Sequence, residues 1–238
     1  RDCLLSRGLG DVYKRQAMSP EKEQEYLSAL ESILAAGQAV LARGGSALDA
    51  VTEAVRLLED CPLFNAGHGA VFTSAGTHEL DAAIMDGATL RSGAIANVNC
   101  VRNPVFAARA VMETSKHVFF VGEGAEAFAK DAGLELVDPS YFSTEARREQ
   151  LLRVQRETPE AAVLDHDGQA MVARGQPAPA DPLDSDKKFG TVGAVALDAQ
   201  GNLAAATSTG GITNKQVGRV GDAPVSYTHL RAHETRGN

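Results

Sequence analysis

The stretch Gly190–Asp198, GTVGAVALD, decides how this chain folds. A loose segment rich in Pro, Asp and Gln precedes it, at about 158–189, and an apolar strand pattern follows its threonine. Inside a chain a threonine is a poor nucleophile, because its hydroxyl is barely acidic and has no base beside it. At a new N-terminus its own amine can accept the hydroxyl proton. The step Gly190-Thr191 therefore indicates a self-processing hydrolase, although an ordinary strand after an ordinary loop also fits this local pattern.

The composition is typical of soluble globular proteins. Of the 238 residues, 44% are apolar and 23% are charged, and the formal net charge is −8. No basic stripe offsets this charge, which argues against nucleic-acid binding. No apolar run of the sequence approaches the roughly 20 residues that span a bilayer, so we expect no membrane association. Cys3, Cys61 and Cys100 show neither metal-ligand spacing nor a disulfide framework, which favours the reducing cytoplasm.

The two ends of the chain differ from the sequence between them. Residues 1–16 show no sustained helical or strand period, and residues 226–238 are polar. Both segments resemble translated adapter or vector sequence, so we expect them to be non-native and exclude them from the fold. His229 and His233 have a metal-like spacing, which we attribute to the same artefactual tail.

Between the ends the sequence predicts helices and short strands. Ser19 and Ser46 each offer an oxygen that can cap the first amides of a helix. Helices are expected from Ser19-Pro20 to Gly44, from Ser46 to Pro62, from Asn103-Pro104 to Met112, over 123–131, and as a charged, exposed helix over 143–157. Strands are expected at 70–72, 78–81, 93–98 and 117–121, and on both sides of a turn at 200–202. This order favours a layered α/β protein over a strict βαβ repeat.

Several motifs carry a family resemblance. They are ALDAVTEAVRLLEDCPLFNAGHGAVF (47–72), HELDAAIMDG (78–87), NPVFAARAVM (103–112), GTVGAVALD, GNLAAATSTGGITNK (201–215) and GRVGDAP (218–224). In this order, over about 19–225, they resemble the plant-type asparaginase/isoaspartyl peptidase family of N-terminal-nucleophile hydrolases. The resemblance implies an α+β fold, the four-layer αββα sandwich of these hydrolases, incomplete in this chain.

The resemblance also divides the chain into parts. Residues 17–190 match the α-subunit-like part of a single hydrolase domain, with a flexible linker at about 158–189, and residues 191–225 match the start of the β-subunit-like part. In the family, further strands and a Thr-Gly-rich segment with the oxyanion hole follow Val225. Oxyanion donors typically contribute about 2.7–4 kcal/mol each to lowering the barrier. We therefore expect this chain to be a truncated fragment with little or no activity.

The mechanism that the resemblance implies begins with self-cleavage between Gly190 and Thr191. The Thr191 hydroxyl then attacks L-asparagine or a β-aspartyl dipeptide, and water hydrolyses the resulting aspartyl ester. Thr209 matches the hydroxyl that hydrogen-bonds the nucleophile, and Asn65 matches a supporting residue nearby. Arg219 matches the residue that binds the substrate α-carboxylate, and Asp222 matches the partner of its α-ammonium. A surface ion pair is the alternative for these two charges.

The resemblance implies a structural sodium ion and no required cofactor. Its ligands would be mostly backbone carbonyls, those of Leu58, Glu59, Cys61, Phe64, Ala66 and His68. Oxygen ligands from a turn-rich loop suit a hard cation. His68 stands where the family often has an aliphatic residue, which is immaterial if only its carbonyl binds.

The partners expected are small-molecule substrates, with no nucleic acid and no membrane, and the family's processed halves assemble as a dimer of αβ units. Two alternatives stay open. A glycosylasparaginase-like hydrolase would have aspartate before the threonine, where this chain has Gly190. In a non-enzymatic small-molecule-binding α/β domain, Gly190-Thr191 would be an ordinary transition from a loop to a strand. The sequence does not separate asparaginase from isoaspartyl peptidase preference.

Overall fold

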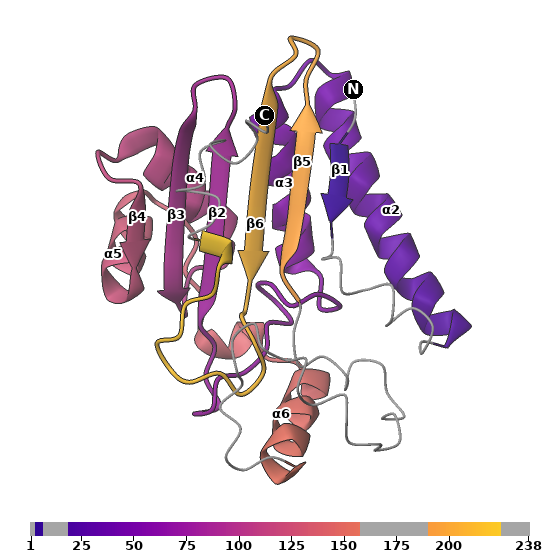
Figure 1. Cartoon of the computed structure of the whole chain (residues 1–238), viewed down its shortest axis with the longest axis vertical. Helices are drawn as coiled ribbons and strands as arrows, with labels where there is room; N and C mark the ends of the chain where they lie inside the picture. The colour runs from indigo at the N-terminus through magenta and orange to yellow at the C-terminus, as the bar shows by residue number, and fades with distance from the viewer. Residues whose placement is uncertain (1–2, 7–18, 158–189, 225–238) are drawn as a thin grey trace, which may run out of the picture.

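The computed structural model describes residues 3–6, 19–157 and 190–224 (Figure 1). The linker expected at about 158–189 and the tail at 226–238, with its two histidines, lie outside the described residues. The elements are β1 (Cys3–Ser6), α2 (Pro20–Ala42), α3 (Ala47–Asp60), β2 (Leu80–Asp86), β3 (Arg91–Val98), α4 (Pro104–Thr114), β4 (Phe119–Val121), α5 (Gly122–Asp131), the 3₁₀ helix η1 (Pro139–Phe142), α6 (Glu145–Glu157), β5 (Val192–Leu197) and β6 (Leu203–Thr209).

In the described part of the chain the strands form one six-stranded sheet in the order β1-β5-β6-β2-β3-β4. Neighbouring strands run antiparallel, except that β4 lies parallel to β3. Val192 of β5 lies opposite Ser208 of β6, and Asp81 of β2 lies opposite Thr209 of β6. The start of β5, the end of β6 and the start of β2 therefore lie at the same end of the sheet, which carries Thr209.

The two N-terminal helices begin where their capping serines predict. Ser19 Oγ accepts a hydrogen bond from the Lys22 N–H at 3.3 Å, and Ser46 Oγ accepts one from the Asp49 N–H at 3.1 Å. These bonds satisfy amides that have no partner inside the helix. The first helix ends just before Gly44, whose φ of 83° suits a helix terminus.

Asp198, the last residue of GTVGAVALD, ties its strand to α3. Its Oδ1 accepts hydrogen bonds from the Gln200 N–H at 3.0 Å and the Asn202 N–H at 2.9 Å, which closes the turn between β5 and β6. Its Oδ2 accepts from the Ala47 N–H at the start of α3, at 3.2 Å. The turn expected at 200–202 is thereby confirmed, and one carboxylate anchors a hairpin and a helix together.

The core lies between one face of the sheet and the helices, with α3 behind β5 and β6 in Figure 1. Val51 and Val55 of α3 belong to the same buried cluster as Ala194 of β5 and Ala206 of β6. Each fully buried valine contributes roughly 1.5–3 kcal/mol, and the small strand residues let the helix approach closely. This packing holds β5 and β6 in place from behind.

The opposite face of the sheet is open at β5 and β6. Val195, Leu197 and Leu203 there are 45%, 37% and 60% exposed. The described residues thus comprise one helical layer and one sheet layer, which correspond to one half of a four-layer αββα sandwich. The expected α+β fold is confirmed. Among the described helices, none has the length and apolar character needed to cross a bilayer.

Excluding Cys3–Ser6, part of residues 1–16, from the fold was wrong. Cys3–Ser6 forms β1, which pairs antiparallel with β5 at the edge of the sheet, with Leu4 opposite Val195. A run of four residues is too short to show a strand period, so the pairing with a distant strand decides its structure. That the segment is non-native stays a prediction.

The strand expected at 70–72 was also wrong. The Val71 N–H donates to Asn65 Oδ1 at 2.9 Å, and the Phe72 carbonyl accepts from the Asn214 N–H at 2.9 Å, so this segment is a buried loop. Its hydrogen bonds go to a side chain and a distant loop, which no local pattern reveals.

Two further differences concern extents. The strand expected at 78–81 is β2, which begins at Leu80 and continues to Asp86. The helix expected at 143–157 is present as α6 but is not exposed on every side, because Arg147, Gln150 and Leu151 are buried. Figure 1 shows α6 beyond the end of the sheet at which β6 ends. It covers the same end of the molecule as the predicted site.

Candidate active site

The predicted nucleophile and its hydroxyl partner lie at the same end of the sheet. Thr191 immediately precedes β5, and Thr209 ends β6. Because Val192 pairs with Ser208 in an antiparallel register, the next position along places Thr191 opposite Thr209. Thr191 is partly buried, and Thr209 is buried. The structure therefore brings the two threonines together, and their roles as nucleophile and hydroxyl partner stay predictions.

Asn65 lies between Gly190, where cleavage is predicted, and the end of β6. Its Oδ1 accepts from the Val71 N–H at 2.9 Å, its Nδ2 donates to the Gly211 carbonyl at 2.7 Å, and its own carbonyl accepts from the Gly210 N–H at 3.0 Å. The side chain is thus fixed from both ends. A Cβ added to Gly190 would lie 2.5 Å from both Asn65 Cβ and Nδ2. Asn65 consequently contacts the residue whose carbonyl would be attacked.

The Thr209 hydroxyl is oriented by the turn that follows it. Its Oγ1 accepts a hydrogen bond from the Gly211 N–H at 3.0 Å. A hydroxyl that accepts in this way still has its own proton to donate. The Thr209 hydroxyl can therefore donate toward the neighbouring strand, where Thr191 lies.

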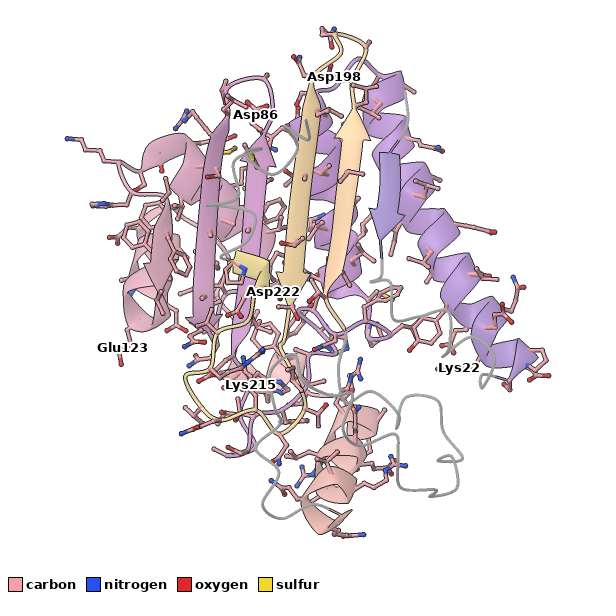
Figure 2. All side chains as sticks on the ribbon, viewed as in Figure 1. Lys22, Asp86, Glu123, Asp198, Lys215 and Asp222 are labelled. Carbon is pink, nitrogen blue, oxygen red and sulfur yellow. The ribbon has the colours of Figure 1, made fainter. Side chains whose placement is uncertain are left out.

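The loop that carries Arg219 and Asp222 follows β6 and returns to the sheet. The Arg219 N–H donates to the Gln216 carbonyl at 3.1 Å, and a Cβ added to Gly221 would lie 3.2 Å from Arg219 Nη1. Asp222 is exposed. The loop ends at Ala223, whose carbonyl accepts from Thr207 Oγ1 at 3.3 Å on β6. Figure 2 shows Asp222 far from Asp198, at the end of β6 where Thr209 lies.

Three buried or partly buried charged residues beside this loop were missed by the sequence reasoning. Lys215 is 2% exposed, Asp81 is fully buried, and Glu79 is partly buried. Lys215 Nζ donates to the Glu79 carbonyl at 3.0 Å and lies 3.6 Å from Glu79 Oε2. Burial raises the pKa of Asp81, and the charge of Lys215 opposes that rise. Their signal was the spacing of Glu79 and Asp81, two acids placed to lie on one face of a strand.

In the loop expected to hold sodium, backbone groups of the loop contact carbonyls of the same loop. The His68 N–H donates to the Glu59 carbonyl at 2.7 Å. A Cβ added to Gly69 would lie 2.6 Å from the Pro62 carbonyl oxygen and 2.8 Å from that of Phe64, so carbonyls converge where the loop has no side chain. Hard oxygen donors of this kind fit a sodium ion. The described residues contain no cluster of three His, Cys, Asp or Glu side chains that could hold a metal ion.

Glu59 also contributes a buried side chain at this loop. Its Oε1 accepts from the Val105 N–H at 2.9 Å, and burial raises the pKa of its carboxyl to about 8. Cys61 and Cys100 are free thiols that are partly buried. Burial raises the pKa of Cys61, and burial together with the nearby Glu126 raises that of Cys100 to about 11. A raised thiol pKa does not suit a nucleophile.

The comparisons with known proteins show which family the chain belongs to. Residues 2–229 match the family model described as Asparaginase, and the chain therefore belongs to this family of hydrolases. The resemblance stated from the motifs is confirmed.

The relatives carry more specific names. The chain is 58% identical over 218 residues to "Isoaspartyl peptidase" of Escherichia coli (strain K12), covering 92% of this chain and 63% of the relative. It is 59% identical over 218 residues to "Isoaspartyl peptidase" of Salmonella typhimurium, covering 92% and 65%. It is 41% identical over 207 residues to "Isoaspartyl peptidase/L-asparaginase" of Homo sapiens, covering 87% and 61%. The chain thus spans less than two thirds of the length of these three relatives.

Proposed function

We propose that this chain carries the nucleophile of a self-processing threonine amidohydrolase that acts on β-aspartyl dipeptides and L-asparagine. The observation that carries the proposal is the contact of Gly190 with Asn65, beside the paired ends of β5 and β6. Relatives named isoaspartyl peptidase and isoaspartyl peptidase/L-asparaginase support the same substrates.

Self-processing proceeds by an acyl shift. The Thr191 Oγ attacks the Gly190 carbonyl carbon, the peptide C–N bond breaks, and the nitrogen leaves as the Thr191 α-amine. Water then hydrolyses the ester between Gly190 and Thr191 Oγ, leaving a carboxylate on Gly190. Asn65 holds the Gly190 backbone in place, and Thr209 supplies a hydrogen bond to the attacking hydroxyl. The product is a threonine whose own amine can act as its base.

Turnover repeats this chemistry on the substrate. The freed amine of Thr191 takes the hydroxyl proton while Oγ attacks the β-carbonyl of the aspartyl group. Ammonia leaves from asparagine, or an amino acid leaves from a β-aspartyl dipeptide, and water hydrolyses the ester to release aspartate. Arg219 pairs with the α-carboxylate through its planar guanidinium, and Asp222 pairs with the α-ammonium.

The proposal extends to the surroundings of the site. A sodium ion held by carbonyls between Leu58 and His68 would brace the loop that presents Asn65, by neutralising oxygens that otherwise repel one another. The whole protein would act in the cytoplasm as a dimer of processed αβ units.

The test is the intact mass of the purified chain after incubation. The little or no activity expected above concerns substrate hydrolysis; for self-cleavage we expect two fragments that meet at Gly190-Thr191, and a single chain for Thr191→Ala. Thr213→Ala is the matched control, since Thr213 is buried nearby and its hydroxyl has no hydrogen-bond partner among the described residues. A chain that stays whole would favour a non-enzymatic binding domain. Cleavage that persists in Thr191→Ala would point to a contaminating protease.

A further inference from the structure

A cluster of charges joins the start of β2 to the loop after β6, and the mechanism above does not use it. Its members are Glu79, Asp81 and Lys215, and Lys215 contacts Glu79, which lies 136 positions earlier in sequence. An ammonium that is 2% exposed needs carboxylates around it, because an unpaired buried charge is strongly unfavourable. The cluster therefore holds the start of β2 and the loop after β6 together, at the end of the sheet that carries Thr209.

Glu79 holds the first residue of the GRVGD loop. Its Oε1 and Oε2 both accept from the Gly218 N–H, at 2.9 Å and 3.1 Å. Gly218 has a φ of 85°, a conformation that L side chains rarely adopt, so this amide is turned toward the carboxylate by a glycine. Arg219 follows directly in the chain, so the Glu79 contact fixes the backbone next to it.

Asp81 faces the other end of the same loop. It lies opposite Thr209 in the pairing of β2 with β6, and its Oδ1 accepts from the Asn97 N–H at 2.9 Å. The Gly221 amide faces the same carboxylate and opposes the rise in its pKa that burial causes. The Arg219 charge is close enough to Lys215 to contribute to lowering the pKa of that ammonium, in addition to the larger effect of burial. Both ends of the loop thus meet the start of β2.

We propose that Glu79 is a positioning residue, which fixes the loop 218–222 so that Arg219 and Asp222 present their charges to an α-amino acid head group. The inference rests on the proposed function, since it assigns no role to the loop other than holding the substrate. A loop with glycines at both ends has many conformations open to it, and ordering each residue opposes binding by about 1–2 kcal/mol. The Glu79 carboxylate removes that freedom before the ligand arrives.

A purely structural role for Glu79 makes a different prediction. Loss of stability would lower the folded fraction but would leave the ligand preference of the folded protein unchanged. Loss of positioning would weaken recognition of the α-ammonium while the protein stays folded. The ratio of affinities for L-aspartate and succinate measures this, because succinate has both carboxylates but no ammonium.

The experiment compares Glu79→Gln, Glu79→Ala and Glu113→Gln with the unmodified chain by calorimetric titration with L-aspartate and with succinate, each variant being checked by thermal unfolding. Glu79→Gln keeps an oxygen for the Gly218 N–H but removes the charge facing Lys215, and Glu79→Ala removes both. Glu113, paired with Arg109 on α4 at 2.7 Å, is the control carboxylate away from the loop.

We expect the unmodified chain and Glu113→Gln to prefer L-aspartate. The preference should fall by about tenfold in Glu79→Ala, which corresponds to about 1.4 kcal/mol, and to a smaller extent in Glu79→Gln. A folded Glu79 variant with the full preference would overturn the inference alone. If Glu79→Ala does not fold, the ratio of the affinities of Glu79→Gln for L-aspartate and succinate tests the inference. An unmodified chain that neither splits at Gly190-Thr191 nor prefers L-aspartate would overturn the proposed function and this inference together.

Discussion

Gly190 packs directly on the side chain of Asn65, which two hydrogen bonds hold in place. A residue 125 positions earlier in the chain therefore defines the space beside the predicted scissile bond. Any side chain at position 190 would overlap the Asn65 amide. This packing is a more direct reason for a glycine before Thr191 than the flexibility of the glycine backbone.

Replacing Gly190 by alanine tests this packing. We expect Gly190→Ala to displace Asn65, to lower the free energy of unfolding by about 1–3 kcal/mol, and to slow self-cleavage by about 100-fold. Denaturant unfolding and the time course of fragment formation measure the two effects. Gly124→Ala is the control, because an added Cβ there meets nothing within 4 Å. Equal cleavage rates in Gly190→Ala and Gly124→Ala would show that the contact has no role.

Asn65 itself can be divided into its two hydrogen-bonding halves. Asn65→Asp keeps the oxygen that accepts from Val71 but loses the donor to the Gly211 carbonyl, and Asn65→Ala loses both. Each buried group left unpaired is unfavourable by about 1–3 kcal/mol. We expect urea unfolding to show a smaller loss of stability in Asn65→Asp than in Asn65→Ala. Self-cleavage should be slower in both variants. If Asn65→Ala cleaves itself at the rate of the unmodified chain, Asn65 has no role in self-cleavage.

The stability of the protein should fall with rising pH because of Glu59. Burial raises the pKa of this carboxyl from 4.5 to about 8, so between these values the folded state keeps a proton that the unfolded state releases. The contribution is fully present below pH 4.5 and decreases by about 1.4 kcal/mol per pH unit as the pH rises toward 8. Glu59→Gln, which carries no proton to lose, should flatten this slope in denaturant titrations, whereas Glu113→Gln should not. Parallel slopes for the unmodified chain and Glu59→Gln would contradict the burial effect.

Sodium should stabilise the loop from Leu58 to His68. We expect a higher midpoint of thermal unfolding in sodium chloride than in tetramethylammonium chloride at equal ionic strength, because only the smaller cation fits among carbonyls. Gly69→Ala should remove the difference, since its Cβ would meet the Pro62 and Phe64 carbonyls. Gly76→Ala imposes a similar backbone strain in open space and should retain it. Equal midpoints in both salts for the unmodified chain would argue against the ion.

Local sequence patterns predicted the helices better than the strands. Ser19 and Ser46 mark helix starts because capping acts within one turn, and the structure confirms both. The loop at 70–72 was mistaken for a strand because its hydrogen-bond partners, Asn65 and Asn214, lie outside any local window. Strand β1 was missed for the same reason, since its pairing with β5 is nearly two hundred residues distant.

The candidate site divides in a similar way. The motifs located Thr191, Thr209 and Asn65, and the pairing of β5 with β6 places the two threonines opposite each other. The roles of these three residues, and those of Arg219 and Asp222, stay predictions. The cluster around Lys215 was not foreseen, because it depends on β2 lying beside β6, and a sheet order cannot be deduced from the period of single strands.

The most direct measurement is N-terminal sequencing of the smaller fragment of the incubated chain. If Thr191 is the nucleophile, the fragment begins Thr-Val-Gly-Ala-Val, and Thr191→Ala yields no such fragment. A fragment that begins at any other residue, or a chain that stays whole while it is folded, would contradict the central claim.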